Sequence, residues 1–136
     1  MTWIYKDKEI HSHDDLLPGC TDFVYVITYN NGQKYIGKKT VASFRTKPPL
    51  KGKKRNRRIW TKLPFLKYAG SHDKAKDLEP VTKEILYQSK GKKAATYIEA
   101  ALLFEHDAIF DESYINENIS GTFYNNSLDG LLTEET

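Results

Sequence analysis

The sequence predicts an α+β fold, in which a small antiparallel β-sheet of three main strands is flanked by helices. Two segments rich in β-branched and aromatic residues, 23–29 and 34–39, are separated by Asn30-Asn31-Gly32, a turn signal typical of a β-hairpin. A third strand is expected over 81–87, and 92–110 is the strongest helical segment because it is built on Ala, Leu, Ile and Glu. A hairpin followed by a strand and a helix is typical of a small domain around an antiparallel sheet.

The length of 136 residues predicts a single domain, 1–136. Within it we expect a core over 22–119, preceded by an irregular N-terminal arm over 1–21 with a short strand around Trp3–Tyr5. Residues 40–62 form a basic excursion between the hairpin and the rest of the core. The excursion contains two adjacent prolines, which forbid a continuous helix there.

The composition excludes several classes of protein and site. Cys20 is the only cysteine, so an intramolecular disulfide and a Cys-rich zinc site are both excluded. No apolar run approaches the roughly 18 residues that a membrane-spanning helix needs, and the first residues do not have the pattern of a signal peptide. We therefore expect a cytoplasmic protein without a membrane partner.

Charge is distributed unevenly along the chain. Between Lys34 and Lys74, fourteen Lys and Arg residues stand against one acidic residue, whereas the remainder holds seven basic and seventeen acidic residues. The segment Lys51–Arg58 alone carries six positive charges. A basic segment on an otherwise acidic protein indicates a polyanionic partner, most simply a nucleic acid, because charges this dense repel one another unless a partner neutralises them.

The turn length of the hairpin decides which side chains share a face. A two-residue loop at Asn31-Gly32 would pair Tyr25 with Lys38, whereas a three-residue loop pairs Tyr25 with Gly37. We favour the three-residue loop because it places Gly32 where a positive φ is required. In that register one face carries Phe23, Tyr25, Ile27, Tyr35 and Lys39, and Gly37 leaves space beside the Tyr25 ring. The opposite face, with Val24, Val26 and Ile36, is the more uniformly apolar and is expected to be the packing face.

The predicted helix carries a carboxylate among apolar neighbours. Ala95, Leu102 and Leu103 lie three or four residues from Glu99 and therefore on the same helix face. A carboxylate there is disfavoured unless it is paired, exposed at an edge or bound to a metal. Glu105 is the competing candidate. Three lysines near the start of the helix oppose its macrodipole, and a bound phosphate would relieve that conflict.

These segments together resemble the GIY-YIG nuclease superfamily, and most closely its small phage-encoded endonucleases. The first motif departs from the family pattern because Phe23 stands where the family has glycine. The resemblance covers about residues 22–119. It rests on two hairpin motifs, a glutamate motif, a late asparagine segment and a Tyr-Ala-Gly-Ser sequence after the basic stretch: 23–27, 34–39, 97–100, 114–118 and 68–71.

The resemblance implies hydrolysis of DNA phosphodiester bonds with one divalent metal, Mg²⁺ or Mn²⁺. Glu99 would bind the metal, Tyr25 would accept a proton from the attacking water, and Tyr35 would orient the water or the phosphate. Asn116 would brace the site or contact the backbone. A free phenol titrates near 10, so a phenolate at neutral pH needs the pKa lowered by about 3 units, which Lys39 and the metal would supply.

The resemblance also implies a catalytic arginine soon after the second motif. Arg45 is the closest arginine in the sequence and is the residue we assign to this role. The alternatives are three later arginines and two other groups that can carry positive charge: Arg55, Arg57, Arg58, His72 and Lys39.

The basic excursion is expected to bind DNA, with RNA as an alternative substrate. The resemblance to phage-encoded enzymes implies that the host cell cytoplasm is the place of action. A homodimer is one assembly that would make a double-strand cut. Trp60 is expected to pack beneath the excursion rather than stack on a base. Phosphate contacts are expected from Lys51, Lys53, Lys54, Arg55, Arg57 and Arg58.

Three other functions compete with this hypothesis. The first is a non-catalytic nucleic-acid-binding module that keeps a nuclease fold, since fold alone does not determine activity. The second is an RNA-directed or repair-type nuclease that recognises structure rather than sequence. The third is a metal enzyme that uses His11 and His13, which would share one face of a strand but have no evident third ligand.

Overall fold

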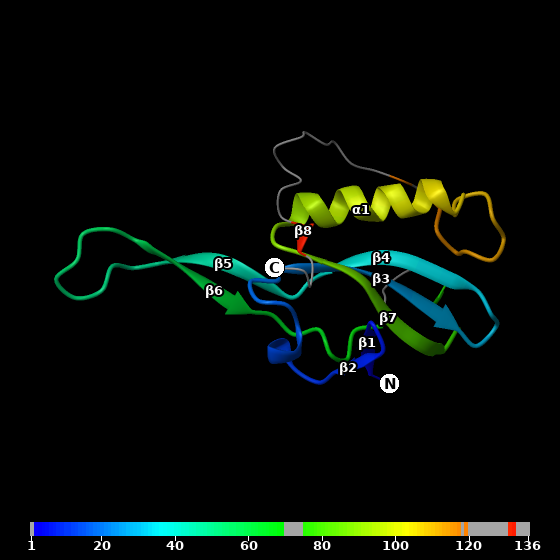
Figure 1. Cartoon of the computed structure of the whole chain (residues 1–136), viewed down its shortest axis with the longest axis horizontal. Helices are drawn as coiled ribbons and strands as arrows, with labels where there is room; N and C mark the ends of the chain where they lie inside the picture. The colour runs from blue at the N-terminus through cyan, green and yellow to red at the C-terminus, as the bar shows by residue number, and fades with distance from the viewer. Residues whose placement is uncertain (1, 70–74, 118, 120–130, 133–136) are drawn as a thin grey trace.

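A mixed β-sheet forms the centre of the computed structural model, which describes residues 2–69, 75–117, 119 and 131–132 (Figure 1). The strand order is β2-β1-β7-β3-β4, and β8 pairs with β7 beside this path. The three main strands β7, β3 and β4 are antiparallel, as predicted. The bounds are β1 Trp3–Tyr5, β2 Lys8–Ile10, β3 Asp22–Tyr29, β4 Lys34–Thr40, β7 Pro80–Ser89 and β8 Leu131–Leu132.

The β3–β4 hairpin has the predicted register. Tyr25 pairs with Gly37 across the two strands, and the Tyr29 amide donates to the Gln33 carbonyl at 2.9 Å. Gly32 has a φ of 87°, the left-handed conformation that the three-residue loop requires. The register therefore places the side chains of Tyr25 and Tyr35 on the same face of the sheet.

The N-terminal segment is not an irregular arm. β1 pairs in parallel with β7 and antiparallel with β2, so the segment adds two strands and makes the sheet mixed. Trp3 is fully buried, and its Nε1 donates a hydrogen bond of 3.1 Å to the carbonyl of Phe65. The physical reason is the burial of apolar surface. Moving the large Trp3 side chain out of water into the core stabilises the fold more than leaving it on a solvated arm would.

Both faces of the sheet are packed. The helix α1, Lys92–Glu105, covers the face of Val24 and Ile36, as expected (Figure 1). The larger core lies on the opposite face, where Tyr25 and Phe23 pack against Trp3 and Phe65. The Val24 face therefore packs as predicted, and the opposite face carries a second, larger core that the sequence did not predict.

The helix ends five residues before the predicted boundary at 110. Asp107 has a φ of 53°, a left-handed conformation that a helix cannot continue through. The Ala108 amide donates to the Leu103 carbonyl at 2.9 Å, which closes the C-terminus with a capping hydrogen bond. Asp tolerates this conformation better than most residues. The helix therefore ends here, although the helical pattern of the sequence continues.

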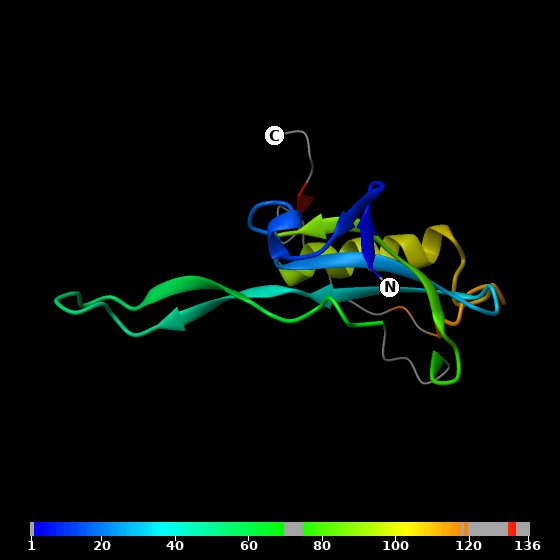
Figure 2. The ribbon, with the colours of Figure 1, turned by 90° about the horizontal axis from the view of Figure 1, so that it is seen from below.

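The basic excursion forms a two-stranded antiparallel ribbon, β5 Ala42–Lys47 and β6 Arg57–Lys62, that projects away from the sheet (Figures 1 and 2). Trp60 anchors its base: the indole Nε1 donates to the Cys20 carbonyl at 3.2 Å, and the ring contacts His13 edge-on. The expected packing of Trp60 beneath the excursion is confirmed. The connection between the two strands contains Pro48 and Pro49.

A buried lysine fastens the segment that follows the ribbon onto the core. Lys83 on β7 is only 3% exposed, and its Nζ donates to the carbonyls of Leu66 and Tyr68 at 2.9 and 2.8 Å. The ammonium also lies 4.6 Å from the ring centroid of Trp3. Burial lowers the pKa of Lys83, and the two carbonyls and the aromatic face compensate for its lost hydration.

Among the residues that the structure describes, no helix is long and apolar enough to cross a membrane. This agrees with the absence of long apolar runs in the sequence.

Replacing Lys83 with Met should destabilise the protein by about 1–3 kcal/mol, because the two carbonyls of the 65–68 segment that accept hydrogen bonds from its ammonium lose their donor. The measurement is urea unfolding followed by circular dichroism. The matched control is Lys76→Met, which removes an exposed lysine and should leave the midpoint within error. Equal midpoints for Lys83→Met and wild type would contradict the role of the buried ammonium.

Candidate active site

Two tyrosines and one glycine meet on strands β3 and β4. The ring centroids of Tyr25 and Tyr35 lie 6.3 Å apart. A Cβ built on Gly37 would lie 2.6 Å from the Tyr25 hydroxyl and 2.9 Å from the Tyr35 ring, so only glycine fits between them. The hairpin register alone creates this arrangement, because Gly37 is the cross-strand partner of Tyr25.

A third tyrosine, Tyr68, completes the cluster; it begins the Tyr-Ala-Gly-Ser motif but was not among the predicted site residues. The Tyr25 hydroxyl donates a hydrogen bond of 3.3 Å to the Tyr68 hydroxyl. The Lys39 ammonium lies 4.6 Å from the Tyr68 ring centroid, which is a cation–π contact. Tyr68 comes from the segment that Lys83 holds in place, so its position depends on a contact with β7, outside the hairpin.

The protonation of the tyrosines differs from the expectation for a reactive phenolate. Burial raises the pKa of Tyr25 far above its ordinary value, and the hydrogen bond with Tyr68 raises it further. Burial also raises the pKa of Tyr35 to about 12, with the Glu99 charge adding to the shift. Lys39 lies over the Tyr68 ring and does not lower the pKa of Tyr25 in the protein alone. Both phenols are therefore neutral at physiological pH.

Glu99 reaches the same strand edge from the helix. The residue is half-buried, and burial raises the pKa of its carboxyl, while Lys38 opposes that shift. Lys38 points to the helix-covered face of β4, whereas Tyr35 belongs to the opposite face. The Glu99 carboxyl therefore interacts electrostatically with one residue of each face of β4.

Asn116 caps the edge of β4 next to the glycine. Its Nδ2 donates to the Ile36 carbonyl at 2.8 Å, and its Oδ1 accepts from the Ile36 amide at 3.0 Å. The side chain therefore pairs with Ile36 as a neighbouring strand would. The Ile115 amide also donates to the Lys34 carbonyl at 2.9 Å, so this segment fixes the strand edge up to the residue before Gly37.

The structure does not bring Arg45 to the tyrosines. All four arginines of the sequence lie on the ribbon or its connection, and Arg45 is exposed on β5 with its Nε hydrogen-bonded to Ser43 at 3.4 Å. The basic groups that lie near the tyrosines and Glu99 are instead Lys38 and Lys39. The alternative His72 falls outside the described residues.

The six residues expected to contact nucleic acid are all exposed. Four lie in the connection at the tip of the ribbon and two lie on β6, so the excursion presents its charge to solvent as predicted: Lys51, Lys53, Lys54, Arg55, Arg57 and Arg58.

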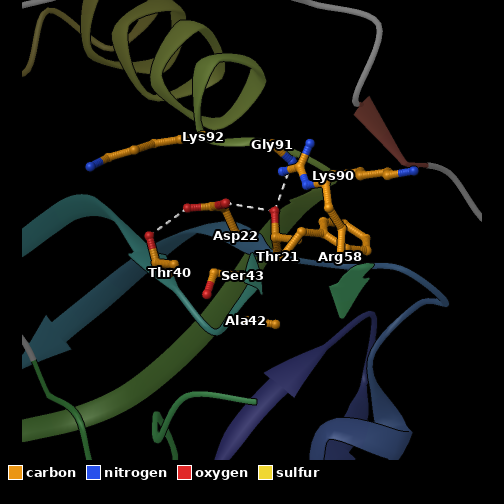
Figure 3. Close-up of a pocket in the computed structure, with 10 residues that line it drawn as sticks. Thr21, Asp22, Thr40, Ala42, Ser43, Arg58, Lys90, Gly91 and Lys92 are labelled. Carbon is orange, nitrogen blue, oxygen red and sulfur yellow. Dashed lines mark hydrogen bonds between the residues drawn. The ribbon is translucent and has the colours of Figure 1, made fainter. Parts of the chain in front are cut away.

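A hollow of about 650 Å³ lies between the base of the ribbon and the N-terminus of α1 (Figure 3). Asp22 is buried beneath it and accepts hydrogen bonds of 2.7 Å from the hydroxyls of Thr21 and Thr40. Gly91 begins the helix without a side-chain cap, and no acidic residue lies in the first turn. Three cations line the hollow: Arg58, Lys90 and Lys92.

The histidine pair does not form a metal site. His13 Nε2 lies 2.8 Å from the Val41 carbonyl and 2.9 Å from the Leu63 carbonyl, so this nitrogen acts as a donor within the fold. His11 is exposed and lies 3.3 Å from Glu9. Within the described ranges no three His, Cys, Asp or Glu side chains cluster as metal ligands.

Residues 3–128 match the family model described as "Putative endonuclease segE, GIY-YIG domain". The chain belongs to this GIY-YIG endonuclease family. The match extends beyond the predicted core of 22–119 and includes β1 and β2, in agreement with their place in the sheet. No curated protein and no solved structure matches the chain. Membership in the GIY-YIG endonuclease family indicates a nuclease with DNA as its substrate.

Replacing Gly37 with Ala should destabilise the protein by about 1–3 kcal/mol and displace Tyr25, because the added methyl overlaps the Tyr25 hydroxyl and the Tyr35 ring. Thermal unfolding measures the first effect, and tyrosine near-ultraviolet circular dichroism measures the second. Thr46→Ala, an exposed change on β5, serves as the control. An unchanged melting temperature and spectrum for Gly37→Ala would show that the close approach of the two tyrosines is not a constraint.

Proposed function

We propose that the chain is a metal-dependent endonuclease that hydrolyses DNA phosphodiester bonds at the exposed edge of β4. The proposal is carried by one observation: Tyr25 and Tyr35 meet beside Gly37, Tyr25 is hydrogen-bonded to Tyr68, and the charge of Glu99 on the helix acts on Tyr35. The absence of a side chain at the buried Gly37 lets the two phenols approach the strand and each other closely, which brings their hydroxyl groups into one cluster. Family membership supports the reaction class.

The donor set fits Mg²⁺ or Mn²⁺. Magnesium is held by one or two carboxylates together with water and substrate phosphate oxygens, and Glu99 supplies one half-buried carboxylate at the strand edge. When bound, the ion would supply Lewis-acid stabilisation of the phosphate charge. Lys38 and Lys39 lie at consecutive positions on opposite faces of β4, so their charges flank the same edge.

The raised pKa of Tyr25 favours a proton relay through neutral phenols over a stored phenolate. The Tyr25 oxygen accepts the proton of the attacking water while its own proton moves to the Tyr68 oxygen, along the hydrogen bond of 3.3 Å. Tyr68 is half-buried and releases its original proton to solvent, so both phenols end neutral. This relay avoids a buried anion, which the environment of Tyr25 strongly disfavours.

Supercoiled plasmid incubated with Mg²⁺ should be nicked or linearised, and EDTA should abolish the reaction. Glu99→Gln should reduce the rate roughly 100-fold or more, because it removes the carboxylate that holds the ion. Tyr25→Phe and Tyr68→Phe should each reduce the rate about 100-fold or more by breaking the relay. Gel electrophoresis of time courses at fixed pH measures all three.

Glu105→Gln is the matched control, since Glu105 is an exposed carboxylate on the same helix. It should cut at the wild-type rate, and all variants should retain the wild-type circular dichroism spectrum. Wild-type rates for Glu99→Gln would refute the metal-binding role of Glu99. Cutting that continues in EDTA would refute metal dependence.

The second candidate function is a non-catalytic DNA-binding module. The observation that favours it is the position of the arginines, all of which lie on the ribbon and not beside the tyrosines. Tight, salt-sensitive binding of plasmid without any cutting, with Mg²⁺ or Mn²⁺ present, would establish this function instead.

A further inference from the structure

We propose that the β5–β6 ribbon enters the major groove of duplex DNA and reads base edges with Arg45 and Arg57. The inference deepens the proposed function, because it takes DNA as the substrate and assigns the residues that choose the sequence. It is tested by binding without metal, so its failure can be told apart from a failure of catalysis.

The charge of the ribbon identifies a polyanion as its partner. Residues 42–62 contain nine Lys and Arg residues and no acidic residue. The ribbon projects from the body of the protein, so this charge is presented on a narrow extension rather than on a flat face (Figures 1 and 2). Contacts with phosphates alone would need no such extension, whereas reaching base edges inside a groove does.

The dimensions of the ribbon fit the major groove of undistorted B-form DNA. Two paired strands lie about 4.8 Å apart, and the B-DNA major groove, about 12 Å wide, admits a two-stranded ribbon. The minor groove of undistorted B-DNA is about 6 Å wide and admits such an element only when the duplex is bent and the groove widened. The major groove of A-form RNA is deep and narrow, so the ribbon cannot read a double-stranded RNA in this way.

Single-stranded DNA is a poorer fit. Sequence-tolerant single-strand binding depends on aromatic side chains that stack on bases. The chain has no aromatic residue between Arg45 and Ile59. The two ribbon aromatics lie at its base and are already engaged: Trp60 donates to Cys20, and the Phe44 ring lies between Arg58 and Lys90, 5.9 and 5.3 Å from its centroid.

The strand register divides the ribbon into two faces with different roles. Phe44 pairs with Trp60 and Thr46 with Arg58, so these residues share one face, which turns toward the body at its base. Arg58 on this face lines the hollow beside Lys90 and Lys92, where sequence-independent phosphate contacts are expected (Figure 3). The buried Asp22 carboxylate also lines this hollow, with both oxygens engaged by hydroxyls.

The other face carries Arg45, Lys47 and Arg57, because Arg45 pairs with Ile59 and Lys47 with Arg57. The hydrogen bonds of the two arginines stay within the ribbon: Arg45 Nε donates to Ser43, and Arg57 Nε donates to the Pro48 carbonyl at 3.1 Å. Each bond uses Nε and leaves the paired Nη groups for a ligand. An arginine fork of this kind matches the O6 and N7 acceptors of guanine.

The position of this face predicts where the cut lies relative to the sequence that is read. Eight residues of nearly continuous strand separate Gly37 from Arg45, or at most about 26 Å at 3.3 Å per residue. At about 3.4 Å per base pair, the cut should fall within roughly 8 base pairs of the contacted guanines.

The test is selection of bound duplexes from a randomised DNA library by the full chain in EDTA. Wild type should enrich sequences with fixed guanines. Arg45→Lys and Arg57→Lys each preserve the positive charge but remove the guanidinium fork. Each variant should lose the preference for guanine at one position of the site, by roughly 5- to 150-fold. Affinity for random duplexes should stay nearly unchanged. Thr46→Ala, an exposed change on the opposite face of the ribbon, is the matched control and should keep the preference.

Methylation interference locates the groove. Methylation of guanine N7 in the major groove should block binding to the selected duplex, whereas methylation of adenine N3 in the minor groove should not. The proposal would be overturned by enrichment of no sequence, by equal losses of preference for Arg45→Lys and Thr46→Ala, or by equal affinity for double-stranded RNA or single-stranded DNA of the selected sequence. Cleavage without sequence preference would overturn this inference and leave the proposed function standing.

Discussion

The pairing of Tyr25 with Gly37 across the β3–β4 hairpin is the constraint on which the candidate site depends. A shift of one residue would move Tyr25 and Tyr35 to opposite faces and place a lysine side chain where the phenol now lies. The left-handed Gly32 sets the loop length that maintains this register. Asn116 then pairs with the backbone of Ile36 and closes the strand edge directly before Gly37. Turn chemistry and a cross-strand contact thus define the place where chemistry can occur.

The edge position of β4 explains how groups from two faces of a sheet can act on one phosphate. Glu99 belongs to the helix layer and the tyrosines belong to the opposite core, yet the Glu99 charge raises the pKa of Tyr35. Only an edge strand allows such an approach, because a central strand would have a neighbour between the two layers. Burial keeps the phenols neutral, and Lys83 holds the segment that carries Tyr68. Stability and chemistry therefore depend on the same contacts.

The sequence predicted the features that rest on local rules. Gly32 and the alternation of the strands predicted the hairpin register, and the apolar neighbours of Glu99 marked it as an unusual carboxylate. The features it did not predict depend on distant partners. Three residues of β1 pair with β7 some eighty positions away, and Tyr68 reaches Tyr25 because Lys83 binds its carbonyl. The sequence did not predict the ribbon, because adjacent prolines and a lysine-rich connection separate its two short strands.

The most direct measurement of the central claim is a crystal structure with Mn²⁺ and a duplex DNA oligonucleotide, analysed by anomalous scattering at the manganese edge. The account predicts one manganese peak in direct contact with the Glu99 carboxylate, with a phosphate beside Gly37 and within reach of the Tyr25 and Tyr35 hydroxyls. A manganese peak elsewhere, with the edge of β4 distant from the DNA, would contradict it.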